Sequence, residues 1–250
     1  MNIKYTGSPL LNPSSAETIL NYANASLQLP VKLKNADIII ISPFVEKWTA
    51  EVKDEQSRQS YYGISLPVTY LKNLNSGNSI ITMAVVRMND EQIDHNAKLQ
   101  VGGAALFVRK RSESLSWRFG VYANGDLFGL FIVPLAGIDW KINEKSNLFG
   151  VLPANLTYER KLNGRIYYGA NFRTFTNSYA KDTGYWRVDE NQLGAFGDFY
   201  FTKQLLLNLE AGSSILRKLR SRTQGKAIDQ WNVNDNLYIK IGMAYRMRFR

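Results

Sequence analysis

The side chains that most often carry catalysis are scarce in this chain and poorly placed for it. The 250 residues include no cysteine and one histidine, His95, which excludes disulfides, thiolate metal sites and cysteine nucleophiles. His95 lies in a polar stretch expected to be a turn between two strands, where no serine is placed to form a dyad with it. The neighbouring Asp90, Glu91 and Asp94 lack the ligand spacing and the glycine of a calcium-binding loop. We therefore expect no enzymatic activity, no cofactor and no metal site.

Four charged residues in the C-terminal half are instead predicted to form a row on one face of neighbouring strands. Counting outward from the turn near Lys203 sets Asp198 opposite Glu210, and counting from the following loop sets Glu210 opposite Lys240. The preceding loop brings Arg173 next to Asp198 by the same reasoning. Two adjacent carboxylates in a confined interior need cations, which Arg173 and Lys240 supply. The row is expected to fasten the interior of the fold, and the alternative is a selectivity ring in a pore.

A basic stretch near the C-terminus is the second candidate site, formed by Arg217, Lys218, Arg220, Arg222 and Lys226. The glycine spacing of a phosphate-cradling P-loop is missing there. In an external loop these residues are expected to bind lipopolysaccharide phosphates, or a partner protein, through charge-assisted hydrogen bonds. The alternative is solvated charge that keeps the loop soluble. The net charge of +10 is spread over turns and alternating positions, so nucleic acid is not an expected partner.

The elements that position these residues are predicted to be strands, because apolar and polar residues alternate one by one in segments of about ten residues. Near the C-terminus the apolar side of the alternation consists of Leu237, Ile239, Ile241, Met243, Tyr245 and Met247. A long apolar face opposite a polar face is typical of a transmembrane β-barrel. No apolar run of roughly 18 residues is present, which excludes a membrane-spanning helix. The mean hydropathy of -0.26 fits a wall that places every second residue against lipid.

About twelve strand-like segments follow from this alternation and from turn signals such as Asn163-Gly164. They lie near residues 18–32, 37–52, 60–72, 79–89, 96–109, 115–124, 131–142, 148–161, 165–176, 192–202, 205–216 and 236–249. Residues 1–17 are expected to be an N-terminal periplasmic or plug-like extension of a single domain. The connections 177–191 and 217–235 are long and polar. Since bacterial barrels have long external loops and short periplasmic turns, both termini are expected in the periplasm.

The alternation also assigns residues to the lipid face and to a membrane rim. We expect a lipid-facing set of Leu156, Ile166, Ala170, Phe172, Leu205, Leu207, Leu209, Ile239, Ile241 and Met243. Leu206 is expected to face inward and to tolerate Arg better than Leu207 does. An aromatic girdle at one rim is expected from Tyr158, Tyr168, Phe199, Phe201, Tyr245 and Phe249. The alternative is the ordinary enrichment of aromatic residues in strands.

Short motifs in the middle of the chain carry a family resemblance. They are Phe119-Gly-Val-Tyr, Leu127-Phe-Gly, Pro134-Leu-Ala-Gly-Ile-Asp-Trp140, Phe149-Gly-Val-Leu-Pro153 and Tyr167-Tyr-Gly-Ala. Together they resemble the uncharacterised outer-membrane β-barrel proteins of Bacteroidota-type Gram-negative bacteria, most clearly over residues 117–175. The resemblance implies fold and location only, because such families carry no agreed activity. One departure is the C-terminus, where Phe249 is followed by Arg250, whereas barrels often end on the aromatic residue.

These features predict an all-β fold, namely an antiparallel up-and-down transmembrane β-barrel of about 12 strands, with about 10 or 14 as alternatives. The expected location is the bacterial outer membrane, and the expected partners are the lipid bilayer, lipopolysaccharide and other envelope proteins. The expected function is a narrow or plugged pore, or a barrel subunit of a larger envelope complex. The alternatives are an outer-membrane lipid-modifying enzyme and a soluble lipid-binding β-barrel.

Overall fold

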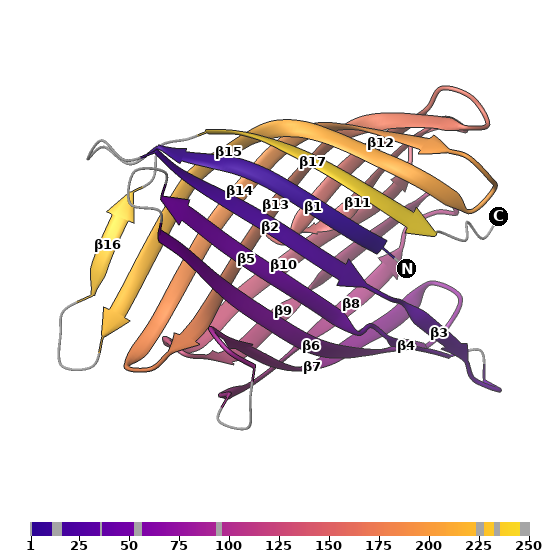
Figure 1. Ribbon diagram of the computed structural model, residues 1–250. Helices are drawn as coiled ribbons and strands as arrows, with labels where there is room; N and C mark the ends of the chain where they lie inside the picture. The colour runs from indigo at the N-terminus through magenta and orange to yellow at the C-terminus, as the bar shows by residue number, and fades with distance from the viewer. Residues whose placement is uncertain are drawn as a thin grey trace.

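The computed structural model describes residues 2–11, 17–35, 37–52, 57–93, 97–223, 228–232 and 236–245, which form strands joined by turns (Figure 1). No helix in these residues is long and apolar enough to cross a membrane. The strands are β1 (Asn2–Leu11), β2 (Glu17–Ser26), β3 (Leu29–Lys32), β4 (Ile38–Ile41), β5 (Phe44–Val52), β6 (Ser57–Asn73), β7 (Asn78–Asp90), β8 (Leu99–Lys110), β9 (Leu115–Asp126), β10 (Gly129–Lys141), β11 (Ser146–Leu152), β12 (Asn155–Lys161), β13 (Ile166–Lys181), β14 (Gly184–Tyr200), β15 (Leu205–Thr223), β16 (Asp229–Asn232) and β17 (Asn236–Tyr245).

Fourteen of the described strands form one closed circuit of antiparallel pairs, in the order β1, β2, β5 to β15 and β17. The circuit closes where β17 pairs with β1. The short strands β3 and β4 pair with each other as continuations of β2 and β5, and β16 pairs with β15. The predicted antiparallel barrel is therefore present, and the described circuit has not the predicted twelve strands but fourteen, which was one of the two alternatives.

The two additional strands lie where the turn signals of the sequence are weak. Residues 2–11, expected in an extension, form β1 and pair with both β2 and β17. The segment 148–161, expected to be one strand, is the hairpin of β11 and β12, which turns at Pro153 and Ala154. Proline cannot donate to a strand ladder, yet the apolar alternation on either side of Pro153 continues and conceals the turn.

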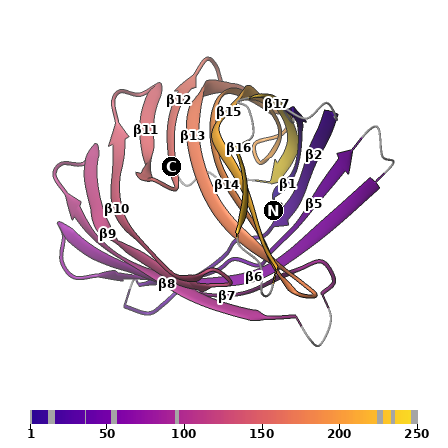
Figure 2. The ribbon, with the colours of Figure 1, turned by 90° about the vertical axis from the view of Figure 1, so that its left-hand side faces the viewer.

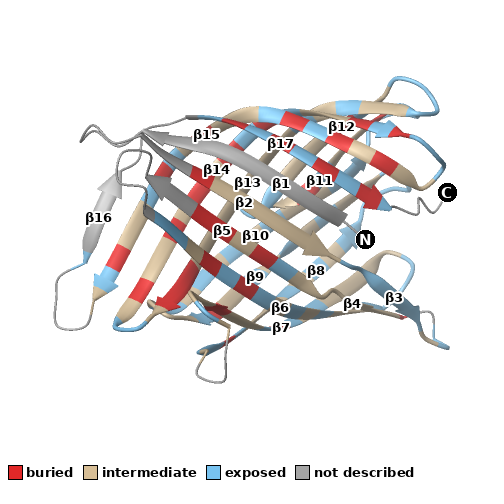
Figure 3. Cartoon of the chain, viewed as in Figure 1, coloured by how far each residue is buried: buried red, intermediate tan, exposed pale blue. Residues whose placement is uncertain are grey.

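Side chains alternate between the outside and the inside of the wall, as Figure 3 shows for β17. Ile239 is 71% exposed, whereas its neighbours Tyr238 and Lys240 are 1% and 2% exposed. The strand registers place all ten residues of the predicted lipid-facing set on the outer face. Leu206 faces inward as predicted, but it is fully buried in a cluster with Tyr200 and Ala244. A guanidinium at Leu206 would replace these packed apolar contacts, so the better tolerance of Arg at Leu206 than at Leu207 stays a prediction that the structure does not favour.

One end of the barrel is formed by five turns of four residues each, at 74–77, 111–114, 142–145, 162–165 and 201–204. In each turn the side chain of the second residue accepts a hydrogen bond from the backbone N–H two residues later, a geometry that Asn, Ser and Thr favour. These residues are Asn75, Ser112, Asn143, Asn163 and Thr202.

The predicted aromatic girdle lies near the same end. Its exposed members are Tyr168, Phe199, Phe201 and Tyr245. Tyr158 is half-buried, and Phe249 lies outside the described residues.

At the opposite end, β13, β14 and β15 run beyond their neighbours and bend across the opening (Figure 2). Ala180 forms a parallel bridge with Asp90 of β7, and the N–H of Glu91 donates to the carbonyl of Ala180 at 3.2 Å. This bridge closes a smaller ring of seven strands, β7 to β13, within the circuit. The segment 177–191, predicted to be an external loop, is thus a paired strand hairpin. Residues 174–191 are called the inward hairpin below.

A β-bulge in β15 changes which face its residues occupy. Between the pairs Asp189–Lys218 and Asn191–Ile215, β15 contains one residue more than β14, and Leu216 adopts a φ of 51°. An inserted residue reverses the alternation beyond it. Odd-numbered residues therefore face outward from Leu205 to Ile215, and even-numbered residues do so from Lys218 onward.

Candidate functional site

Three of the four predicted charges meet on the inner wall. Glu210 of β15 lies opposite Lys240 of β17, as the sequence predicts, and the Lys240 Nζ is 2.8 Å from the Glu210 Oε2. Arg173 of β13 reaches the same carboxylate and forms an ion pair with it. The hydroxyl of Tyr238 donates to Glu210 Oε1 at 2.7 Å, and the Asn171 amide donates to Oε2 at 3.1 Å. Glu210 is thus compensated by two cations.

The position of Asp198 differs from the prediction. Asp198 faces inward but lies opposite Asn208, whose amide donates to it at 2.7 Å, so the prediction that it lies opposite Glu210 is wrong. Arg173 lies opposite Gln192 and not beside Asp198. The β14–β15 pairs are centred on Lys203, whereas a pair of Asp198 with Glu210 would be centred on residue 204. A shift of one residue in the centre of a turn moves the partner residue by two. The four residues therefore form a three-charge cluster with one carboxylate beside it.

A cavity of about 410 Å³ lies over this cluster on the inner side of β11 to β15. Polar and charged side chains make up most of its lining, together with two phenylalanines. The lining residues are Phe149, Asn155, Thr157, Glu159, Asn171, Arg173, Phe196, Asp198, Asn208 and Glu210. An interior of this composition favours water and small polar solutes over an apolar ligand, because carboxylates and amides lose hydration against an apolar ligand.

Glu46 of β5 holds the inward hairpin against the opposite wall. Its Oε1 accepts a hydrogen bond from the Tyr179 hydroxyl at 2.6 Å and one from the Asn177 amide at 3.1 Å. Its Oε2 accepts a hydrogen bond from the Tyr22 hydroxyl at 2.8 Å. Because Tyr179 and Asn177 belong to the hairpin and Glu46 belongs to the wall, these hydrogen bonds connect the two. The four residues Glu46, Tyr22, Asn177 and Tyr179 are called the latch.

The hairpin also contacts the wall on its other side, through Ser178. The Ser178 hydroxyl donates to Asp126 of β9, and its backbone carbonyl accepts from Asn89 at 3.1 Å and from Gln100 at 3.3 Å. Arg87 forms an ion pair with Asp126 and donates to Asn177 Oδ1 at 3.1 Å. Polar groups of three wall strands therefore satisfy the hairpin at the point where it crosses the opening.

An aromatic cluster packs beside the latch and excludes water from it. Tyr179 and Tyr61 have ring centroids 5.7 Å apart, and Tyr61 and Trp186 are 6.1 Å apart. Leu20 and Trp48 complete the buried part of this cluster. Aromatic contacts of this kind add about 0.5–1.5 kcal/mol each beyond area burial. The hairpin is thus a packed element of the barrel at this end.

The bulge in β15 corrects the prediction for the basic stretch. Arg217, expected in an external loop, is fully buried and forms an ion pair with buried Glu190, with an Nη2–Oε1 distance of 2.8 Å. Lys218 and Arg222 are exposed and Arg220 is half-buried, all on the outward face of β15. Lys226 lies outside the described residues. The predicted basic site is therefore divided between the two sides of the wall.

The remaining chemical candidates contribute little to the described structure. His95 and Asp94 lie outside the described residues. Asp90 takes part in the bridge to Ala180, and Glu91 accepts a hydrogen bond from Gln59 at 2.8 Å. Among the described residues, no group of three or more carboxylate or histidine side chains is placed to hold a metal ion.

Sequence reasoning missed the latch residue Glu46, the hairpin acceptor Asp126 and the buried Glu190. Each is an acidic residue at an inward position of a strand. That pattern is a usable signal, because a carboxylate on the inner face of a barrel wall needs a partner from another strand. The partner strand cannot be identified from the pattern, since the inward hairpin is separated from Glu46 by more than 120 residues in sequence.

Comparisons with known proteins find solved structures that are similar to this chain. A FadL homologue from Pseudomonas aeruginosa is similar at 9% identity with a TM-score of 0.54, over 99% of this chain and 89% of that one. The NanC porin and the translocator domain of the autotransporter NalP from Neisseria meningitidis give TM-scores of 0.44 and 0.43 at 9% and 11% identity. Both alignments cover 98% of this chain, with 100% of the porin and 86% of the translocator domain.

The likeness to the FadL homologue shows the fold alone, which is that of outer-membrane β-barrels. A search of curated proteins finds no match. The family described as "Domain of unknown function (DUF6268)" matches residues 49–246. Since this match spans most of the sequence, the chain belongs to the DUF6268 family.

Proposed function

We propose that the protein is an outer-membrane β-barrel that acts as a narrow pore, with the inward hairpin as its gate. The inward hairpin carries this proposal, because it crosses one mouth of the barrel above a polar cavity of about 410 Å³. The outward apolar faces of β15 and β17 support a membrane location. The proposal assigns no catalytic role, and the resemblance to Bacteroidota barrels remains a prediction of the sequence.

The two ends of the barrel support an orientation. The end with five four-residue turns corresponds to the periplasmic side of bacterial barrels, where turns are short. The inward hairpin then lies at the external mouth. A hairpin held by hydrogen bonds to Glu46 and Asp126 can remain closed until a solute or a change in the membrane competes for those contacts.

The test locks the hairpin in place. The natural chain has no cysteine, so Asp90→Cys with Ala180→Cys introduces a single pair across the bridge. Bridged residues have Cα atoms within the range that a disulfide requires. We expect openings in planar bilayers for the wild type and for the reduced variant, and none for the oxidised variant. Each single cysteine variant serves as a control for the substitution itself.

A second variant tests the gate from the other direction. Tyr179→Phe removes one of the three hydrogen bonds to Glu46 while the ring stays in the aromatic cluster. A hydrogen bond to a charged group contributes about 1.5–3 kcal/mol, so the open population should rise roughly 10-fold or more. Equal conductance of the oxidised and reduced double-cysteine variants would refute the gate. Silence of every variant, with envelope proteins that co-purify with the wild type, would favour a subunit of a larger complex.

A further inference from the structure

Four cationic side chains gather on one face of β14 and β15, with Arg187 in the inward hairpin and the other three beside it on β15. Arg187 lies opposite Arg220, and Asp189 lies opposite Lys218. Arg222 follows on the same face, because the bulge at Leu216 brings even-numbered residues outward. Arg187, Lys218, Arg220 and Arg222 are called the basic patch. Asp189 is the carboxylate at its centre, so the patch with its carboxylate has a net charge of +3.

The contacts within the basic patch leave it with an excess of positive charge. Asp189 accepts two hydrogen bonds from Arg187, at 2.9 and 3.0 Å, and also forms an ion pair with Arg220. One carboxylate thus serves two guanidinium groups, each of which carries five donors. The guanidinium of Arg187 lies 3.9 Å from the ring centroid of Phe128, which fixes its orientation. The patch is therefore pre-organised for an anion with several oxygen atoms.

An apolar band lies on the same face of β14, β15 and the adjacent β17, closer to the middle of the wall. Leu193 is four residues from Asp189 along β14, which corresponds to roughly 13 Å of strand. Leu193 is 53% exposed, and Leu216 and Leu237 are 71% and 70% exposed. Positive charge followed by exposed apolar surface matches the order of headgroup and acyl chains in a lipid leaflet.

The wall leaves this face accessible from the side. The β12–β13 pairing ends at Asn155 and Arg173, and the β10–β11 pairing ends at Ala136 and Leu152. Beyond these pairs, the described contact between the β11–β12 turn and β13 is one hydrogen bond from Thr174 to Ala154 at 3.0 Å. The short hairpin of β11 and β12 therefore does not cover the height at which the basic patch lies.

We propose that the basic patch binds the phosphate groups of an outer-leaflet lipid of the lipopolysaccharide class, with its acyl chains along the apolar band. The charge complementarity and the adjacent band favour a lipid phosphate over free phosphate. This inference rests on the proposed outer-membrane location with the inward hairpin at the external mouth. It also replaces the loop site predicted from the sequence, because buried Arg217 takes no part and Arg187 does.

The test measures binding of lipid A to the purified full-length barrel in neutral detergent. The double variant Lys218→Gln with Arg222→Gln removes the two exposed charges of the patch. At about 1 kcal/mol for each charge near a lipid surface, we expect roughly 30-fold weaker binding. Lipid A from which the phosphates have been removed should bind the wild type and the variant equally.

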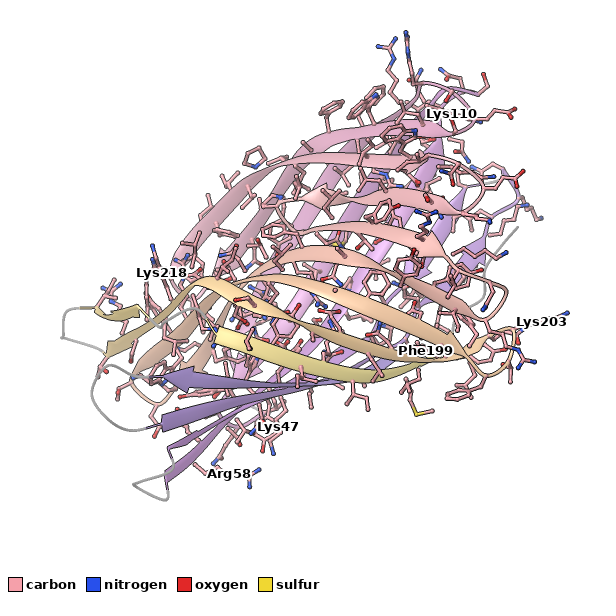
Figure 4. The ribbon with its side chains drawn as sticks, turned by 90° about the horizontal axis from the view of Figure 1, so that it is seen from above. Lys47, Arg58, Lys110, Phe199, Lys203 and Lys218 are labelled. Atoms are coloured by element: carbon pink, nitrogen blue, oxygen red, sulfur yellow. The ribbon has the colours of Figure 1, made fainter. Side chains whose placement is uncertain are left out.

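Two matched controls remove two charges elsewhere. Lys47→Gln with Arg58→Gln acts at the same end of the barrel on β5 and β6, and Lys110→Gln with Lys203→Gln acts at the opposite end (Figure 4). Both controls should bind lipid A as the wild type does. Equal losses in patch and control variants, or full competition by inorganic phosphate at equimolar concentration, would overturn the proposal. Heat-dependent gel mobility reports whether the barrel is folded, and bilayer conductance reports whether it acts as a pore. Because both are measured separately from lipid A binding, failure of the barrel or of the pore is distinguishable from failure of the lipid site.

Discussion

Replacing Arg217 tests whether the bulge in β15 divides the basic stretch between the two sides of the wall. Arg217 and Lys218 are adjacent in the sequence, yet Arg217 is fully buried and Lys218 is exposed. Arg217→Met removes a buried cation from Glu190 and keeps a side chain of similar length. Lys218→Met removes the neighbouring charge from the outer face, and it is the matched control.

The contacts of Glu190 determine the expected magnitude. Its Oε1 accepts from Arg217 at 2.8 Å, from Gln192 at 2.8 Å and from Ser214 at 2.6 Å. Breaking a buried ion pair by removing one partner costs about 3–5 kcal/mol. Since two neutral donors remain on Glu190, we expect a loss near the lower value, about 3 kcal/mol. Lys218→Met should change the free energy of unfolding by less than about 0.5 kcal/mol.

The assay is a urea titration of folding into lipid vesicles, followed by gel mobility without boiling. The double variant Arg217→Met with Glu190→Gln should recover more than half of the loss, because no charge is then left buried. Equal losses for Arg217→Met and Lys218→Met would refute the assignment of faces around Leu216. Failure of the double variant to recover would mean that the side chain of Arg217 contributes packing and not charge compensation.

Three further variants test other parts of the structure. Ile239→Arg places a cation on the lipid face and should destabilise folding into vesicles by about 2–4 kcal/mol if it lies near the midplane; wild-type stability would contradict the outward facing. Lys240→Met leaves Glu210 with less positive charge, so reversal potentials in a salt gradient should shift toward cation selectivity, and an unchanged potential would exclude a role for Glu210 in selectivity. Hydrogen bonds from Tyr70, Asn35 and Asn73 lower the pKa of Asp37 in the β3–β4 turn. Its stabilising effect should therefore be present above about pH 4 and disappear as the pH falls below it, and a stability difference between wild type and Asp37→Asn that persists at pH 2 would contradict this.

The alternation of residues predicts much of the wall, because strand period and burial are local properties. It assigns Leu209, Ile239 and Lys240 to the correct faces, and the pairing of Glu210 with Lys240 follows from it. The strand count fails where local signals are ambiguous, as at Pro153, which lies between two stretches of continuous alternation.

The inward hairpin is not predictable from these local signals. Its polar residues, such as Asn177 and Ser178, have the composition of a solvated loop. They are polar because the wall groups that they contact are polar, including Glu46 and Asp126. Such contacts between strands distant in sequence depend on tertiary structure, which single-sequence patterns do not contain.

The bulge at Leu216 decides which side of the wall the residues at the end of β15 occupy. Deleting Leu216 would remove the bulge and leave the residues up to Thr223 on their present faces, because the pair Asn191–Ile215 would then continue in regular register to Asp189–Lys218. Straightening the strand without a deletion would instead turn Arg217 to the lipid side and Lys218 to the inside. A substitution changes one side chain, whereas the extra residue determines the facing of every side chain beyond it. We therefore expect a homologous chain without the bulge to be one residue shorter here.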